Sequence, residues 1–90
     1  MNSQLILTHG TRRVLEPGSG PRYSPEEVRA LLGCDRIAVV HVAPRRGVEM
    51  VLLVDQDGTD RGREMNLDAS VICLRPIVGP ALLCPAEAFQ

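Results

Sequence analysis

The sequence predicts an α+β protein built around a mainly antiparallel sheet, with elements in the order β-β-α-β-β-α-β. Three observations lead to this class. Short β-rich runs are separated by turn residues, one segment carries a full set of helix-capping signals, and no parallel βαβ pattern is present. At 90 residues the chain is long enough for one domain. We therefore expect a single domain over 1–90, with an N-terminal hairpin over 1–16 and a core over 22–84.

The first two elements read as a hairpin followed by a linker. Residues 5–7 are an apolar strand core, and 9–11 supply turn chemistry around Gly10. Residues 12–16 return as a second strand with a mostly polar outer face. The segment 17–21, rich in Pro and Gly, cannot continue strand pairing and is expected to be a linker.

The clearest helix signal follows the linker. Ser24 is a natural N-cap, Pro25 stands at the first helical position, and Glu27 completes a capping box. Gly33 is placed to end the helix in the left-handed conformation. The apolar residues repeat on one helical face, which must lie on a sheet because so short a helix is unstable alone; they are Val28, Leu31 and Leu32.

Residues 37–42 and 48–54 are predicted to form two antiparallel strands joined by the five-residue loop 43–47. Pairing centred on Arg45 would place His41 opposite Glu49. Both sheet faces are then apolar, whereas a half-exposed antiparallel sheet usually has one polar face. The predicted helix covers one face, so the other must meet the C-terminal segment or a second copy, and we favour self-association. The residues expected on this oligomer face are Val40, Val42, Val48, Met50 and Leu52.

The C-terminal third is predicted to hold a short helix and a last strand. Asn66 is suited to cap the helix, and Pro76 stops it. Residues 77–84 read as a strand in which Pro80 indicates a sheet edge or a bulge. Residues 85–89 are expected to form one closing helical turn.

No metal site or cofactor is expected. The Asp- and Gly-rich stretch 55–60 reads as a turn, because Gly58 comes too early for a calcium-binding loop. The three cysteines show no C-x-x-C spacing, and a zinc site would have to gather them with His9 or His41 across the fold. We expect buried, reduced thiols instead; the cysteines are Cys34, Cys73 and Cys84.

Composition argues against membranes and nucleic acid as partners. The net charge is −1, and Tyr23 and Phe89 are the only aromatic residues, too few for base stacking. No apolar run approaches the roughly 18 residues of a membrane span. The first residues lack the features of a secretion signal, so we expect a cytoplasmic protein.

Arginines in or beside turns are the candidate ligand-binding residues. All ten basic residues are Arg, which either reflects a GC-rich genome or serves bidentate recognition of anions. If the turns meet at one end of the sheet, guanidinium groups there would suit a phosphate-bearing small molecule. The alternative is that these side chains are ordinary solvated surface. The set consists of Arg12, Arg13, Arg22, Arg45, Arg46, Arg61 and Arg63.

The expected His41–Glu49 pair is the nearest approach to acid–base chemistry. A neighbouring carboxylate could bring the imidazole near neutral pH, but a cross-strand polar pair at a sheet rim explains the two residues equally well. No nucleophile can be placed beside them from the sequence. We therefore do not expect an enzyme.

Two segments resemble a known family. Residues 23–28 and 31–33, followed by a hairpin ending in Asp57-Gly58, form one half of the resemblance. Asn66 and Ala69, followed by the apolar run 77–83, form the other. Together they resemble a domain-of-unknown-function family of short proteins from bacteriophages, plasmids and conjugative elements. The resemblance spans about residues 22–84 and implies an accessory protein of a mobile element in the bacterial cytoplasm, with no catalytic residues to carry over.

Two functions from different classes follow as expectations. The first is a non-enzymatic, homo-oligomeric module that binds or sequesters a phosphorylated small molecule such as a nucleotide signal, as an anti-defence protein would. The second is an effector that docks an apolar sheet face on a host protein.

Overall fold

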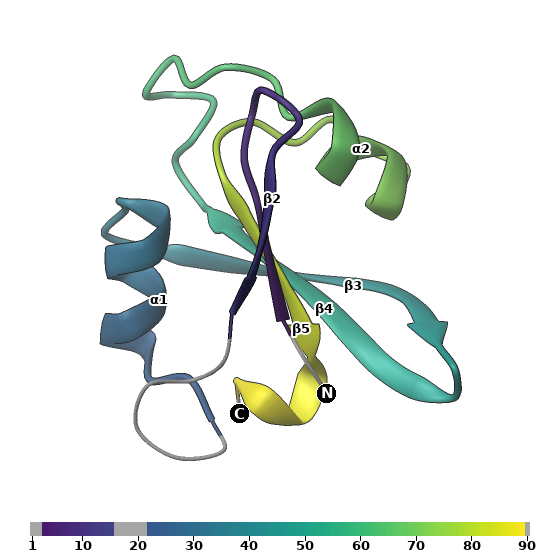
Figure 1. The fold of residues 1–90 in the computed structure, drawn as a ribbon. Helices are drawn as coiled ribbons and strands as arrows, with labels where there is room; N and C mark the ends of the chain where they lie inside the picture. The colour runs from purple at the N-terminus through teal and green to yellow at the C-terminus, as the bar shows by residue number, and fades with distance from the viewer. Residues whose placement is uncertain (1–2, 16–21, 90) are drawn as a thin grey trace.

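The structure, a computed structural model, describes residues 3–15 and 22–89 and shows one five-stranded antiparallel sheet with a helix on each face (Figure 1). The expected α+β class and element order are confirmed. The predicted linker 17–21 lies outside the described residues. The strands are β1 (Ser3–Ile6), β2 (Arg12–Leu15), β3 (Ile37–Arg45), β4 (Val48–Asp55) and β5 (Ala81–Pro85). The helices are α1 (Pro25–Leu32), α2 (Leu67–Cys73) and the 3-10 turn η1 (Ala86–Ala88).

The predicted signals at both ends of α1 are confirmed. The Ser24 hydroxyl accepts from the Glu27 backbone N–H, and the Glu27 carboxylate accepts from the Ser24 N–H, which completes the capping box. Gly33 ends the helix in the left-handed conformation with φ 64°. Helix α1 therefore begins and ends where the sequence places it.

Strand β5 lies at the centre of the sheet, in the order β2-β1-β5-β4-β3. Leu82 pairs with Leu5 of β1 on one side and with Leu53 of β4 on the other. The expectation that Pro80 marks a sheet edge or a bulge is therefore wrong. Pro80 precedes β5, so its missing N–H removes no bond from the ladder.

The β3–β4 hairpin closes with a two-residue turn, not the predicted five-residue loop. Arg46 and Gly47 both have positive φ, 51° and 78°, as a type I′ turn requires. Strand β3 continues to Arg45 through an irregularity after Val42 that absorbs Pro44 on this edge strand. The register differs by two residues from the prediction, so His41 faces Val51 and not Glu49. A shift of two leaves each side chain on its predicted face.

Each sheet face has its own buried cluster. On the α1 side, Val28 and Leu32 pack against Val51, Leu53 and Leu82. On the other side, Ala69 of α2 and Ile77 from the segment after α2 belong to one buried cluster with residues of β3, β4 and β5. The strand that α2 mainly contacts is β3.

The expectation that the second face lies open for another copy is wrong for most of its residues. Val40, Met50 and Leu52 are buried within the chain, while Val42 and Val48 are half-buried at the rim of the cluster. The reason is that α2, although only seven residues long, contributes Ala69, Ile72 and Cys73 to the apolar cluster on this face, and Ile77 after the helix joins it. One chain thus covers most of both faces.

Asn66 fixes α2 to the sheet as well as capping it. Its Oδ1 accepts from the Ala69 N–H at 3.1 Å, as predicted for an N-cap. Its Nδ2 donates to the carbonyls of Ile6 (3.0 Å) and Gly79 (2.9 Å), and its side chain is fully buried. One side chain therefore links β1, α2 and the segment that leads into β5.

Candidate functional site

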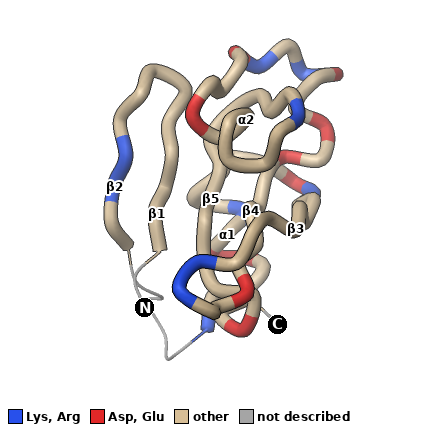
Figure 2. The backbone as a smooth tube through the Cα atoms, turned by 90° about the vertical axis from the view of Figure 1, so that its right-hand side faces the viewer, with Lys and Arg blue, Asp and Glu red and all other residues tan. Residues whose placement is uncertain are grey.

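The seven candidate arginines lie in separate parts of the chain. Figure 2 shows basic segments on β2, at the β3–β4 turn and in the loop between β4 and α2. Arg12 and Arg13 are in β2, Arg22 precedes α1, and Arg45 and Arg46 are at the hairpin turn. A single chain does not bring the set to one end of the sheet, so a pocket shared between copies stays a prediction.

Arg61 and Arg63 are engaged by the buried carboxylate of Asp55. The Asp55 Oδ2 accepts from Arg61 Nη1 at 2.9 Å and from Arg63 Nε at 2.7 Å, and its side chain is 1% exposed. Both guanidinium groups also donate to the Gly33 carbonyl at the end of α1. This cluster ties the loop after β4 to α1, where cations favourably meet the helix C-terminus.

Arg36 and Asp57 form a second ion pair beside this cluster. Arg36 donates from Nε and Nη2 to the two carboxylate oxygens of Asp57, and these bonds hold the pKa of Asp57 below its usual value. The predicted turn 55–60 is confirmed, with Asp55 Oδ1 accepting from the Asp57 N–H. Each of the three arginines of this region, Arg36, Arg61 and Arg63, is therefore engaged by a carboxylate of the same chain.

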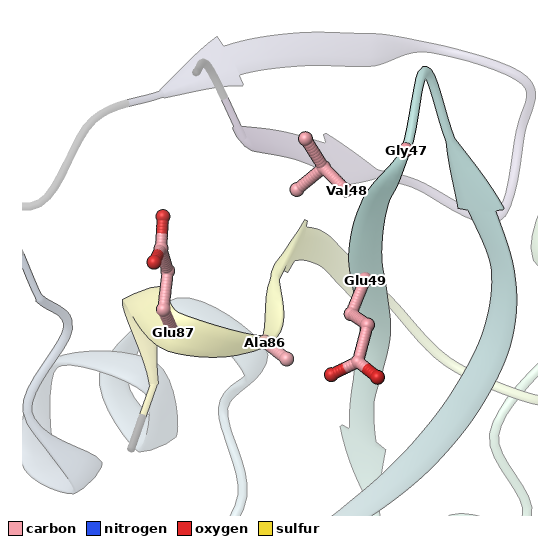
Figure 3. A pocket seen from close by; sticks show the side chains of 5 residues that line it. All are labelled: Gly47, Val48, Glu49, Ala86 and Glu87. Carbon is pink, nitrogen blue, oxygen red and sulfur yellow. The ribbon is translucent and has the colours of Figure 1, made fainter.

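His41 and Glu49 both lie at the surface and do not face each other across the hairpin. Glu49 instead borders a shallow depression of about 360 Å³ between the start of β4 and η1, lined by Gly47, Val48, Glu49, Ala86 and Glu87. Figure 3 shows Glu49 projecting from β4 and Glu87 from η1. The lining brings two carboxylates to the depression but no nucleophile and no cation.

Two of the three thiols are buried. Burial raises the pKa of Cys84 to about 11, and burial together with the Asp55 carboxylate raises the pKa of Cys34. Both thiols are therefore neutral at neutral pH and lack the thiolate that nucleophilic chemistry needs. Within residues 3–15 and 22–89, no group of three His, Cys, Asp or Glu side chains is placed to hold a metal ion.

The outer surface of α2 carries an apolar patch that the sequence analysis missed. Ala69 faces the sheet, whereas a second set of apolar residues on and beside the same helix faces away from it. We call this set the outer stripe. It comprises Met65 (51% exposed), Leu67 (67%), Val71 (73%) and Leu74 (89%).

Leu74 holds its exposed side chain in an unfavourable backbone conformation. It is the C-cap of α2 with φ 58°, a left-handed geometry that costs a non-glycine residue about 1 kcal/mol. Glycine is the usual residue at such a helix end. Leu74 is therefore disfavoured both by its backbone and by the exposure of a large apolar side chain, which points to a contact outside the folded chain.

The spacing within residues 67–74 is the signal that could have found the stripe. Leu67, Val71 and Leu74 recur at intervals of four and three residues, while Ala69 and Ile72 occupy the opposite side. A seven-residue helix on one sheet needs a single apolar face, so a second face indicates another contact. Two further exposed apolar residues, Val14 and Val39, lie on the edge strands β2 and β3.

Helix α1 and helix α2 are both too short to cross a membrane, and the part of the chain that the structure describes has no helix long and apolar enough to do so. No protein-family model matches the chain, and the curated proteins and the solved structures likewise give no match.

Proposed function

We propose that the chain is a non-enzymatic accessory protein of a phage or other mobile element, acting in the bacterial cytoplasm by binding another protein chain through the outer stripe. The observation that carries the proposed protein binding is the outer stripe itself, and the mobile-element origin is what the resemblance of residues 22–84 implies. Four large apolar side chains, half to nine-tenths exposed, are grouped on and directly beside one short helix. Grouped exposed apolar residues of this kind mark protein contacts, whereas isolated ones do not.

Site-specific cross-linking tests this function without knowledge of the partner. A photoreactive amino acid at Val71, introduced in cells that express the protein, is expected to yield a cross-linked protein product because Val71 is 73% exposed in the stripe. The matched control is Glu26, an exposed position on α1 across the sheet. A Val71 position that cross-links no more than Glu26 would contradict the proposal.

Binding of a phosphorylated small molecule is a second candidate function, favoured by the β3–β4 turn. Arg46 takes φ 51° at a turn position that usually holds Asn or Gly, and Arg45 stands beside it, also exposed. The positive φ of this position therefore disfavours Arg, so its presence there is not explained by the backbone. Two neighbouring exposed guanidinium groups at this turn would suit a phosphate, with a second copy completing the pocket.

The double change Arg45→Ala and Arg46→Ala is expected to remove such a ligand while altering stability by less than about 0.5 kcal/mol, since both side chains are exposed. The chain has no Trp and one Tyr, so a retained nucleotide would dominate the absorbance at 260 nm. Native mass spectrometry of the same sample gives the ligand mass. Arg29→Ala on α1 is the control. A wild-type sample without retained ligand or thermal shift on adding nucleotides would exclude this candidate.

A further inference from the structure

We propose that the occupant of the outer stripe is a second copy of this chain, with the two α2 helices packed antiparallel about a two-fold axis near Val71. This inference rests on the proposed function and names the partner. The stripe suits such pairing because Leu67 and Leu74 flank Val71 at nearly equal distances along the chain. Under a two-fold axis Val71 meets its own copy, and Leu67 meets Leu74 of the other chain.

The charges at the ends of α2 match this arrangement. Asp68 lies in the first turn of the helix, and Arg75 lies just beyond its C-terminus. Antiparallel pairing brings Asp68 of each chain close to Arg75 of the other, whereas parallel pairing would place like charges together. Antiparallel alignment also sets the helix dipoles in opposite directions, which is the favourable orientation. The surface is thus complementary to itself in charge as well as in the spacing of its apolar residues.

The intrachain contact of Asp68 leaves its carboxylate able to pair with Arg75 of the other chain. Its carboxylate lies 3.5 Å from Arg12 Nε, and the Asp68 side chain is still 40% exposed, so this contact does not enclose it. A standard interface takes roughly 800 Å² from each partner, with an apolar centre and a polar rim. The outer stripe supplies the centre, and the Asp68 and Arg75 groups at its ends supply part of the rim.

Charge reversal provides a test that depends on the orientation of the helices. Asp68→Arg alone and Arg75→Asp alone each place like charges at both ends of a symmetric pair, so each variant is expected to weaken self-association at least tenfold. In a mixture of the two variants, every facing pair is again opposite in charge. We expect a heterodimer of the two chains, detected by its mass in native mass spectrometry after one chain is isotope-labelled.

Leu74→Gly separates association from folding. It removes the most exposed side chain of the stripe and relieves the left-handed backbone of Leu74. We expect the thermal midpoint of the monomer, measured at high dilution, to stay constant or rise, while the dimer dissociation constant rises at least tenfold in sedimentation equilibrium. A Leu74→Gly chain that associates as tightly as the wild type would overturn the proposed interface.

The mass of the wild-type protein in solution distinguishes the proposed dimer from the broader proposal that the outer stripe binds some protein chain. A chain that stays a single subunit at its highest soluble concentration overturns the second copy as occupant. If Val71 then still cross-links to a different protein in cells, the proposed function stands. If it cross-links to nothing, both fail. A wild-type dimer whose two charge variants do not combine overturns the antiparallel arrangement.

Discussion

Asn66→Ala is expected to lower the free energy of unfolding by about 3–4 kcal/mol. Loss of an N-cap acceptor accounts for about 1 kcal/mol. The remainder comes from the buried carbonyls of Ile6 and Gly79, which lose their Nδ2 donor and cannot reach water, at about 1 kcal/mol or more each. Urea unfolding followed by circular dichroism measures the change, and the thermal midpoint should fall by roughly 15–25 °C for a chain of this size.

Two further variants isolate the cause. Ser24→Ala removes the exposed cap of α1 and should cost only about 1 kcal/mol. Asn66→Asp keeps the cap acceptor for Ala69 but replaces the donor with a carboxylate oxygen that faces the carbonyls of Ile6 and Gly79, so it should be at least as damaging as alanine. If Asn66→Ala costs no more than Ser24→Ala, the bonds to β1 and to Gly79 contribute nothing to stability.

Asp55→Ala is expected to lower the free energy of unfolding by about 2–3 kcal/mol. Removing one partner of a buried ion pair typically costs about 3–5 kcal/mol, and the lower figure applies here because Arg61 is 46% exposed and keeps part of its hydration. The Arg63 side chain is only 20% exposed, so its guanidinium keeps less hydration and loses more stabilisation when the carboxylate is removed. The Asp57 backbone N–H also loses its acceptor. Chemical denaturation measures the effect.

A double-mutant cycle assigns the loss to the ion pair. In the Arg63→Met background the same Asp55→Ala change should cost less, because no partly buried cation is left behind. Asp57→Ala, which breaks the exposed pair with Arg36, should cost under about 1 kcal/mol. If the costs of Asp55→Ala and Arg63→Met simply add, the carboxylate does not act through Arg63.

Local signals were predictable from the sequence, and long-range ones were not. The capping box at Ser24, the left-handed Gly33 and the cap at Asn66 involve residues within a few positions of one another, so sequence spacing suffices. The predicted register of the β3–β4 hairpin is wrong because the true register depends on which residues adopt positive φ in the turn. Arg46 does so against its own preference, and only the fold as a whole imposes that turn.

The candidate site was harder to predict for a related reason. The sequence shows that both sheet faces are apolar, but not that the short α2 and Ile77 after it cover most of the second face. The sequence therefore predicts self-association through a sheet face, whereas the exposed apolar residues lie on and beside the outer side of the helix that covers this face. Likewise, nothing in the local sequence shows that Arg61 and Arg63 are engaged by Asp55.

The central place of β5 governs how this chain folds as it is synthesised. The β1–β2 and β3–β4 hairpins are joined in the sheet through β5, and β5 follows both of them in the chain. Until residues 81–85 have left the ribosome, each hairpin has an unpaired edge and an unburied apolar side. Closure of the sheet must therefore wait until β5 has been synthesised, and it pairs residues as distant in sequence as Leu5 and Leu82. Pairing between such distant segments makes folding slow relative to helical proteins of this size, and until it occurs the unpaired edges and apolar sides are exposed to aggregation.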